Sequence, residues 1–241
     1  MLKRLPLSIV ICCTLFITSL ATGLMPSFAI AATSDSPKVQ ENIPEVQTVD
    51  SYLREGFRLY QQGDSRGAEL ALQKAINLEP ENAALHSNLG IVLADQNRFQ
   101  ESIREYREAV RLSPHNPVFH NNLGNVLSRA GDLQGASAEY REAIRLNPKY
   151  ALAYFNLGTA LGHLREFENS NAAYKKAIVL EPKFAPAYAN LGLNLFAQGK
   201  QKQSLVYLKQ ARDLFIEHGM TEDAETVTHI IRIIQTYKQS G

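Results

Sequence analysis

The sequence predicts an all-α protein built from five consecutive helical hairpins and a final helix that covers the last of them. Two observations predict this fold. A glycine recurs every 34 residues, at Gly56, Gly90, Gly124, Gly158 and Gly192. Other columns share the period: a leucine follows each of these glycines by three residues and an alanine by nineteen. Several columns that agree at one period of this length indicate units that stack on one another.

Residues 1–31 have the layout of an export segment. Lys3 and Arg4 are the only charges before Asp35, and an apolar stretch follows them. A short basic start, an apolar core and then small residues are typical of a secretory signal, and the small residues predict cleavage after Ala31. The alternative is an uncleaved membrane anchor, because residues 5–25 are long enough to span a bilayer. Both interpretations predict that the rest of the chain is extracytoplasmic, in a periplasm, in a lumen or secreted.

Residues 32–48 are polar and have neither a helical nor a strand period, so we expect a flexible linker. The two cysteines, Cys12 and Cys13, are adjacent and precede it, which excludes a disulfide framework and a Cys-rich zinc site. The formal net charge of the 241 residues is +1, which gives no reason to expect a nucleic-acid partner.

Each repeat is expected to form two antiparallel helices with a short turn, over residues 49–82, 83–116, 117–150, 151–184 and 185–218. In the fourth repeat Tyr154, Leu157 and Leu161 fall on one stripe at helical spacing. The periodic glycine has no Cβ, so the second helix can approach the first closely. A second column lies where the first helix ends and suits a left-handed cap: Gly63, Asn97, Gly131 and Gly199.

The two ends of the repeat array differ from its middle. In the first repeat Glu55 replaces the leucine that precedes the glycine elsewhere, which fits an end of the array with one solvent-exposed face. Within the C-terminal segment 219–241, we expect a capping helix over residues 222–238 with Thr221 as its N-cap. Its apolar residues recur at spacings of 3, 4 and 3: Ala224, Val227, Ile231 and Ile234.

These columns resemble the tetratricopeptide repeat family. In the fourth repeat the resemblance lies in Leu157 and Gly158, then Tyr174, Ala177 and Pro182 at the family's spacings. It covers residues 49–218 and implies a right-handed solenoid of five hairpins plus a cap. It also implies that the first helix of each hairpin lines a concave groove, where exposed residues select a protein partner.

An asparagine stands two residues before the glycine in four repeats, at Asn88, Asn122, Asn156 and Asn190. Carboxamides both donate and accept hydrogen bonds, so a row of them can hold an extended peptide backbone with little regard to its sequence. This is similar to the asparagine ladder of O-linked glucosaminyl transferases, whose catalytic domain we do not expect in the short segment after residue 218. The alternative is that each asparagine only satisfies a neighbouring turn or carbonyl.

Other residues of the first helices are expected to add to this partner site. Phe155 would offer an apolar contact, and Arg129 and His163 would supply polarity at its edge. Asn121 and Asn125 would supply further amides. A carboxylate clamp of the kind found in chaperone-binding relatives is disfavoured because its cations are missing.

We predict no catalytic residue, metal site or cofactor. His86 and His120 share a column with aromatic residues, so we interpret them as flat rings that fill an aromatic slot. The expected function is a non-catalytic scaffold or assembly factor, monomeric, that binds an extended protein segment and acts in the building of membrane or envelope complexes. The alternatives are a self-assembling structural protein and a membrane-anchored adaptor.

Overall fold

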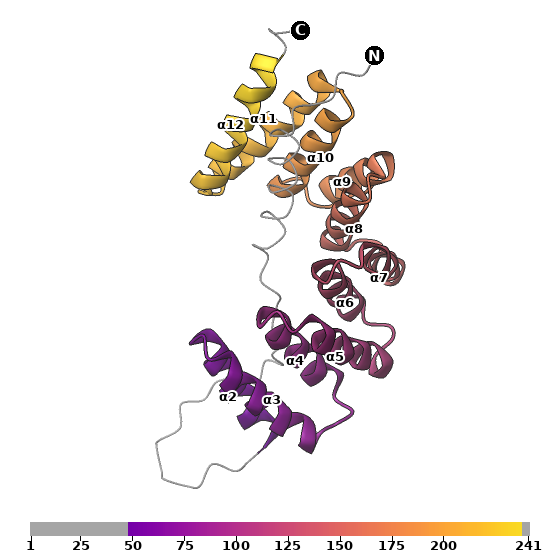
Figure 1. Ribbon diagram of the computed structural model, residues 1–241, viewed down its shortest axis with the longest axis vertical. Helices are drawn as coiled ribbons and strands as arrows, with labels where there is room; N and C mark the ends of the chain where they lie inside the picture. The colour runs from indigo at the N-terminus through magenta and orange to yellow at the C-terminus, as the bar shows by residue number, and fades with distance from the viewer. Residues whose placement is uncertain (1–47, 238–241) are drawn as a thin grey trace. The chain divides into compact units, whose positions relative to one another are not determined.

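The computed structural model describes residues 48–237, and within them it is all-α, as predicted (Figure 1). It falls into two compact units that divide after Asp132, inside the third predicted repeat. Each unit is therefore described by itself. The predicted export segment and nearly all of the predicted linker lie outside the described residues.

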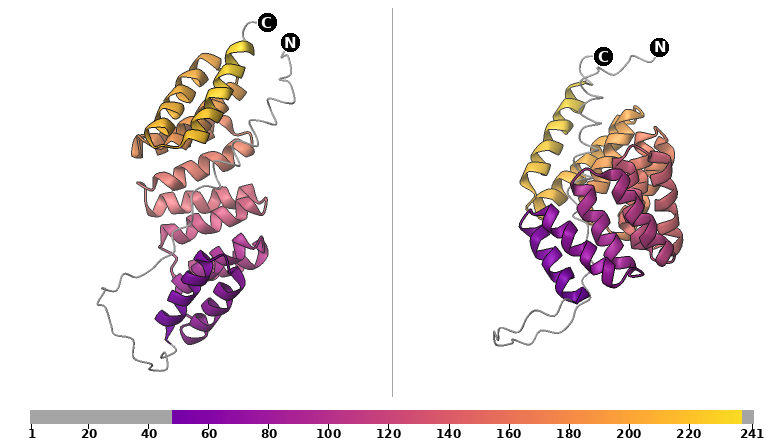
Figure 2. Two further views of the ribbon diagram at one scale, coloured as in Figure 1. Left: turned by 90° about the vertical axis from the view of Figure 1, so that its left-hand side faces the viewer. Right: turned by 60° about the horizontal axis from the view of Figure 1, so that its bottom comes forward.

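Between residues 48 and 237, five helices belong to the first unit and six to the second; Figures 1 and 2 show their arrangement within each unit. Those of the first unit are α2 (Val49–Gln61), α3 (Ser65–Leu78), α4 (Ala83–Asp95), α5 (Phe99–Leu112) and α6 (Pro117–Arg129). Those of the second are α7 (Leu133–Leu146), α8 (Ala151–His163), α9 (Phe167–Leu180), α10 (Ala185–Ala197), α11 (Gln201–Glu217) and α12 (Thr221–Tyr237). The even-numbered helices from α2 to α10 begin at the first residues of the five predicted repeats.

The turns inside the hairpins use the left-handed backbone region. Gly63, Gly131, Gly199 and Asn97 all have positive φ, as their column predicted. The fourth repeat reaches the same conformation without a glycine, because Arg165 has a φ of 61°. Between hairpins, the Asn82 and Asn116 side chains accept hydrogen bonds from the backbone amides of Ala84 and Val118, the second residues of α4 and α6.

In the first unit the second helix of a hairpin packs across the periodic glycine of the first. A Cβ on Gly90 would lie 2.9 Å from the Tyr106 ring, and the Ser102 hydroxyl donates to the Gly90 carbonyl at 2.7 Å. Leu72 and Leu89 belong to the apolar core that joins the first two hairpins. Glycine is therefore needed here for the close approach of a side chain.

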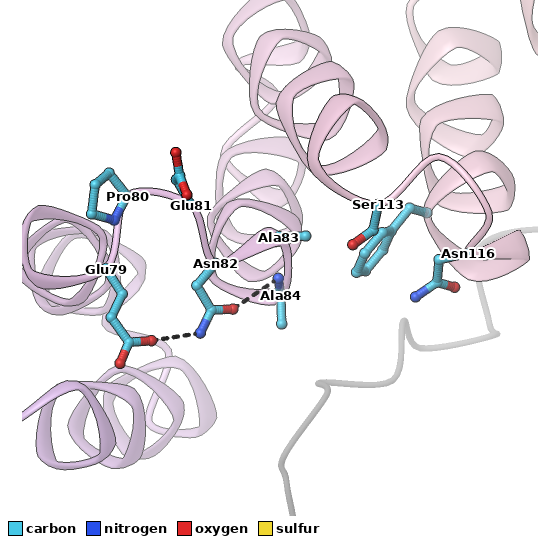
Figure 3. Close-up of a pocket in the computed structure, with 9 residues that line it drawn as sticks. Glu79, Pro80, Glu81, Asn82, Ala83, Ala84, Ser113 and Asn116 are labelled. Carbon is cyan, nitrogen blue, oxygen red and sulfur yellow. Dashed lines mark hydrogen bonds between the residues drawn. The ribbon is translucent and has the colours of Figure 1, made fainter.

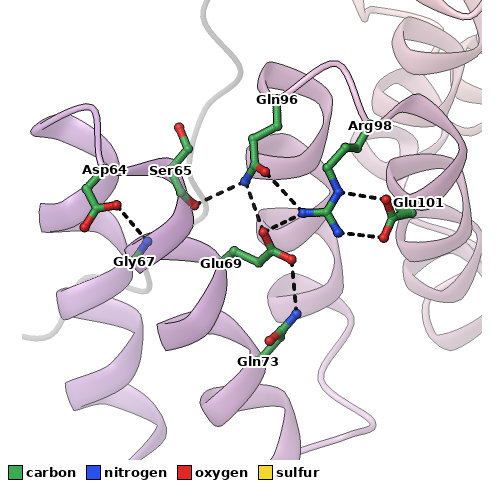
Figure 4. Close-up of polar contacts among 8 residues, drawn as sticks. All are labelled: Asp64, Ser65, Gly67, Glu69, Gln73, Gln96, Arg98 and Glu101. Carbon is green, nitrogen blue, oxygen red and sulfur yellow. Dashed lines mark hydrogen bonds and ion pairs between the residues drawn. The ribbon is translucent and has the colours of Figure 1, made fainter.

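A polar network also joins the first two hairpins (Figure 4). Arg98, which follows α4, pairs with Glu69 of α3 at 2.6 Å and with both carboxylate oxygens of Glu101. Gln96 donates to Glu69 and to the Ser65 carbonyl. Hydrogen bonding from Arg98 lowers the pKa of the Glu101 carboxyl. Because these contacts converge on Arg98, they fix the turn after α4 against α3.

The second unit ends in the capping helix. Ala224, Val227, Ile231 and Ile234 of α12 are buried in one core with residues of α10 and α11. The opposite side of α12 carries Glu225, His229 and Arg232, all exposed. Thr221 is the first helical residue rather than the residue before the helix.

The first hairpin has an exposed side, at the residue that departs from the repeat pattern. The Glu55 side chain is 45% exposed and pairs with Arg58 one turn later, which lowers the pKa of Glu55. No preceding hairpin within the described residues covers this side of α2, so a charged side chain is tolerated there.

Candidate functional site

The asparagine column (Asn88, Asn122, Asn156 and Asn190) lies on four first helices, two in each unit. These helices are enclosed by their neighbours: α4 packs against α3, α5 and α6, and α10 packs against α8, α9 and α11. As a result Asn88 is 1% exposed, Asn122 is 8% exposed and Asn190 is fully buried, while Asn156 is partly buried. The sequence pattern predicts exposed groove residues, whereas these side chains lie deeper than a single amphipathic stripe suggests.

Asn88 is the most unusual member of the column. Both polar atoms of its carboxamide are buried without a hydrogen-bond partner among the described residues. Leaving buried polar groups unpaired costs about 1–3 kcal/mol each. No turn or carbonyl among the described residues satisfies Asn88, which is what a purely structural role would require.

Asn190 occupies the equivalent position in the second unit. It also lacks a hydrogen bond of normal geometry within that unit's described residues, although it lies close to the Tyr174 hydroxyl. That hydroxyl donates to Thr159 at 3.1 Å, and Thr159 donates to the Phe155 carbonyl. Burial raises the pKa of Tyr174 to about 12, against the opposing effect of its polar neighbours. Tyr174 therefore stays a neutral hydrogen-bond donor.

Phe155 is a core residue, which corrects its expected place in an open groove. It is fully buried, and its ring centroid lies 5.8 Å from that of Tyr174 and 4.9 Å from that of Phe184. The helical period placed Phe155 beside the main apolar stripe of α8. In a stacked hairpin that flank also meets a neighbouring helix, so the side chain is enclosed.

Arg129 is held by contacts inside its own unit. Its guanidinium donates to the Ala94 carbonyl at 2.8 Å, pairs with Asp95 at 3.3 Å and lies 5.1 Å above the centre of the Phe99 ring. Asp95 also accepts a hydrogen bond from the Tyr60 hydroxyl. The side chain remains 41% exposed, so Arg129 joins two successive hairpins and still presents polarity at the surface.

The remaining predicted residues are also partly or fully enclosed. Asn121 is 1% exposed, and Asn125 is partly buried; both have interactions within the protein. His163 is half-buried, and this burial lowers its pKa. The structure thus brings Asn88, Asn121, Asn122 and Asn125 onto neighbouring helices of the first unit.

The histidine column makes hydrogen bonds that sequence reasoning missed. His86 Nε2 lies 2.9 Å from the Pro80 carbonyl oxygen, and His120 Nε2 lies 3.0 Å from that of Pro114. Tyr188 donates to the Pro182 carbonyl in the same way. The ring therefore fills an aromatic slot, as predicted, and also ties each hairpin to the loop before it. A polar ring six residues after the periodic proline is the signal that could have revealed this.

A cleft of about 720 Å³ opens between the loops that precede α4 and α6 (Figure 3). Phe119 lines it beside the acidic residues Glu79 and Glu81. The Asn82 carboxamide in this cleft already donates to Glu79 and accepts from the Ala84 amide. None of the predicted partner-binding residues lines the cleft.

Two further observations bear on chemistry. Within residues 48–237 no three His, Cys, Asp or Glu side chains come together as metal ligands would. Over the same residues, no helix combines the length and the hydropathy that a bilayer span requires.

The fold defines a helical repeat protein of the interaction-scaffold class. Its helices pair with a 34-residue period, rings of second helices pack against glycines such as Gly90 and Gly158, and an apolar helix caps the end. The chain belongs to the tetratricopeptide repeat family. Family descriptions match at residues 53–117 (tetratricopeptide repeat), 125–164 (TPR repeat) and 151–184 (tetratricopeptide repeat). A comparison with curated proteins found no match.

Solved structures with the same fold include MamA, YrrB and PilF. MamA is 26% identical with a TM-score of 0.63, covering 72% of this chain and 95% of its own. YrrB, described as a TPR protein with an unusual peptide-binding site, is 19% identical with a TM-score of 0.61, covering 78% and 94%. PilF of Pseudomonas aeruginosa is 19% identical with a TM-score of 0.63, covering 80% and 93%. The likeness to YrrB and PilF extends to the fold alone.

Proposed function

We propose that this chain is a non-catalytic interaction scaffold or assembly factor that acts outside the cytoplasm and binds an extended protein segment along its first helices. The observation that carries the proposal is the unpaired carboxamide of Asn88. The equivalent Asn190 also lacks a hydrogen bond of normal geometry, although it lies close to the Tyr174 hydroxyl. A peptide backbone offers both a donor and an acceptor at each residue, which matches what a carboxamide lacks.

The neighbours of Asn88 suit this role. Asn122 is on α6, which packs against α4, and it is slightly more exposed than Asn88. A partner backbone that reached both amides would gain two to four hydrogen bonds, each worth about 0.5–1.5 kcal/mol net. The partner's side chains would matter less, because backbone pairing does not depend on residue type.

The proposed location outside the cytoplasm rests on the N-terminal sequence. Lys3, Arg4 and the apolar residues after them support export, with either cleavage after Ala31 or retention of residues 5–25 as an anchor. Mass spectrometry of the N-terminus in envelope fractions distinguishes the two. A mature start at Ala32 supports cleavage, an intact N-terminus supports an anchor, and recovery of the whole chain from the cytoplasm contradicts both.

The binding test uses the double variant Asn88→Ala and Asn122→Ala. Alanine is the best helix former, so the helices should persist. Partners are first captured by crosslinking in envelope and membrane fractions, and affinity for the captured protein is then measured. We expect binding to weaken by roughly ten-fold to several hundred-fold, at 1.4 kcal/mol per decade.

The matched control is Arg107→Ala with Arg141→Ala, two exposed residues on the second helices. If this control abolished binding while the asparagine variant bound normally, the partner would contact the second helices and the proposal would fail. Light scattering after size exclusion tests the alternative. Oligomers that grow with concentration would favour a self-assembling structural protein.

A further inference from the structure

Two ion pairs link α9 and α11 of the second unit and show that these helices run in the same direction. Lys200 at the start of α11 pairs with Glu168 at the start of α9 at 3.2 Å. At the other end, Lys183 after α9 pairs with Glu217, the last residue of α11, at 2.5 Å. The ion pairs join the helices start to start and end to end, so their exposed faces are neighbours.

That surface has an unusual composition, and we call it the lysine patch. It consists of four exposed lysines and two exposed valines: Lys175, Lys176, Val179, Lys202, Val206 and Lys209. On each helix the valine and the lysines are three or four residues apart, and all six are exposed, whereas Tyr174 and Leu208 on the same helices are buried. The six exposed side chains therefore point away from the core.

The acidic residues on the two helices do not pair with the lysine patch. Three acidic residues lie on α9 and α11, and all three are paired elsewhere: Glu168 with Lys200, Glu217 with Lys183, and Asp213 with Arg212. Among the described residues, none of the four patch lysines forms an ion pair.

The second helices α5 and α7 lack this imbalance, whereas α3 carries Arg66 and Lys74 beside one acidic residue, Glu69. The helix α5 has three arginines and three glutamates, and α7 has two of each. On both helices an exposed arginine pairs with a glutamate one turn earlier, as Arg111 does with Glu108 and Arg145 with Glu142. A need for solubility explains those balanced faces. It does not explain a face on which unpaired lysines surround the exposed Val179 and Val206.

The two valines indicate what the surface binds. Val179 is 71% exposed and Val206 is 56% exposed, each flanked by lysines along its helix. Lysine is depleted at the centre of protein–protein interfaces, where arginine and aromatic residues predominate. At a bilayer surface, long lysine side chains reach the phosphates while apolar side chains enter the boundary below them.

We propose that the lysine patch is a docking surface for a membrane rich in anionic phospholipid, separate from the asparagine column. A peripheral contact of this kind would orient the protein on the bilayer with α9 and α11 against the headgroups. It requires neither a membrane-spanning helix among the described residues nor a partner in the proposed peptide site.

The test is flotation of the full chain with vesicles of phosphatidylcholine, with and without phosphatidylglycerol. The N-terminal apolar segment contributes to both measurements, so the quantity compared is the increase caused by the anionic lipid. The variant changes all four patch lysines to glutamine. At about five-fold per lysine, we expect this increase to fall by roughly several hundred-fold, and high salt should remove it from the wild type.

The matched control removes four exposed cations elsewhere: Arg104, Arg107, Arg141 and Lys149, each to glutamine. Circular dichroism confirms that both variants keep their helices. In the control variant, the increase in vesicle binding caused by the anionic lipid should stay within a few-fold of the wild-type increase. Equal loss in the control, or no loss in the lysine variant, would overturn the proposal.

Two more variants test the contribution of the valines to vesicle binding and the independence of vesicle binding from the proposed peptide site. Val179→Ser with Val206→Ser should weaken vesicle binding by roughly ten-fold while its salt dependence remains. The Asn88 and Asn122 double variant should bind vesicles normally. If the wild type bound soluble polyglutamate through the four lysines but showed no anionic increase with vesicles, the surface would be a site for acidic protein and the membrane proposal would be wrong.

Discussion

The Tyr174 ring fills the space that any side chain on Gly158 would need. A Cβ on Gly158 would lie 2.7 Å from two carbons of this ring. The ring has little room to move, because Tyr174 is fully buried and its hydroxyl donates to Thr159. Gly158 and Tyr174, sixteen residues apart in sequence, therefore depend on each other: the ring packs here only because the glycine has no Cβ.

Replacing Gly158 with alanine should therefore destabilise the protein. Alanine favours a helix by about 1 kcal/mol over glycine, but overpacking against a fixed ring costs about 1–3 kcal/mol. We expect a net loss in the free energy of unfolding, measured by urea titration. Gly56→Ala is the control, since its nearest neighbour is a leucine carbon at 3.3 Å and it should be close to neutral. Equal losses in both variants would show that the ring contact is not the cause.

His86 joins the second hairpin to the loop before it through both ring nitrogens. Nδ1 lies 2.8 Å from a Glu105 carboxylate oxygen and Nε2 lies 2.9 Å from the Pro80 carbonyl. His86→Phe keeps the flat ring but removes both contacts, and it should cost about 1–3 kcal/mol of unfolding free energy. His86→Tyr should cost less, because Tyr188 shows that a tyrosine can donate to the proline carbonyl. If the phenylalanine and tyrosine variants were equally stable, the carbonyl contact would contribute nothing.

The hairpins were predictable because their determinants are local and periodic. Glycines that end a helix, such as Gly63 and Gly199, act through their own backbone conformation. The capping helix was predictable for the same reason, since Val227 and Ile231 share a stripe on a single helix. These features need no knowledge of which helix packs where.

The depth of the candidate site was not predictable from one helix at a time. Asn88 and Phe155 lie on flanks that look free in an isolated amphipathic helix, but neighbouring helices cover them. The contacts of Arg129 are equally remote in sequence, since Ala94 and Asp95 belong to the previous hairpin. Burial of this kind depends on the stacking of hairpins, which a repeat period indicates only in outline.

Arg165 is a strained member of the turn column. Its φ of 61° lies in the left-handed region, which costs a residue with a Cβ roughly 1–2 kcal/mol. Arg165→Gly removes that strain and adds flexibility to the unfolded chain, so we expect a net gain of about 0.5 kcal/mol in unfolding free energy. Thermal and urea unfolding measure it. The control is Asn97→Gly, which should change stability less because asparagine tolerates this conformation better; a loss of stability in the Arg165 variant would contradict the argument.

His163 should make the protein less stable in mild acid. Burial lowers its pKa below the ordinary value of 6.5, because the imidazolium loses hydration. As the pH falls below that ordinary value, the unfolded chain takes up the proton first, so the free energy of unfolding decreases until the folded protein is protonated as well. Above the ordinary value the effect vanishes. Urea midpoints of the wild type and of His163→Asn, compared from about pH 8 to pH 5, isolate the contribution from that of the other histidines. The wild type should lose more stability than the variant over this interval, and parallel curves would show that the burial of His163 does not affect its titration.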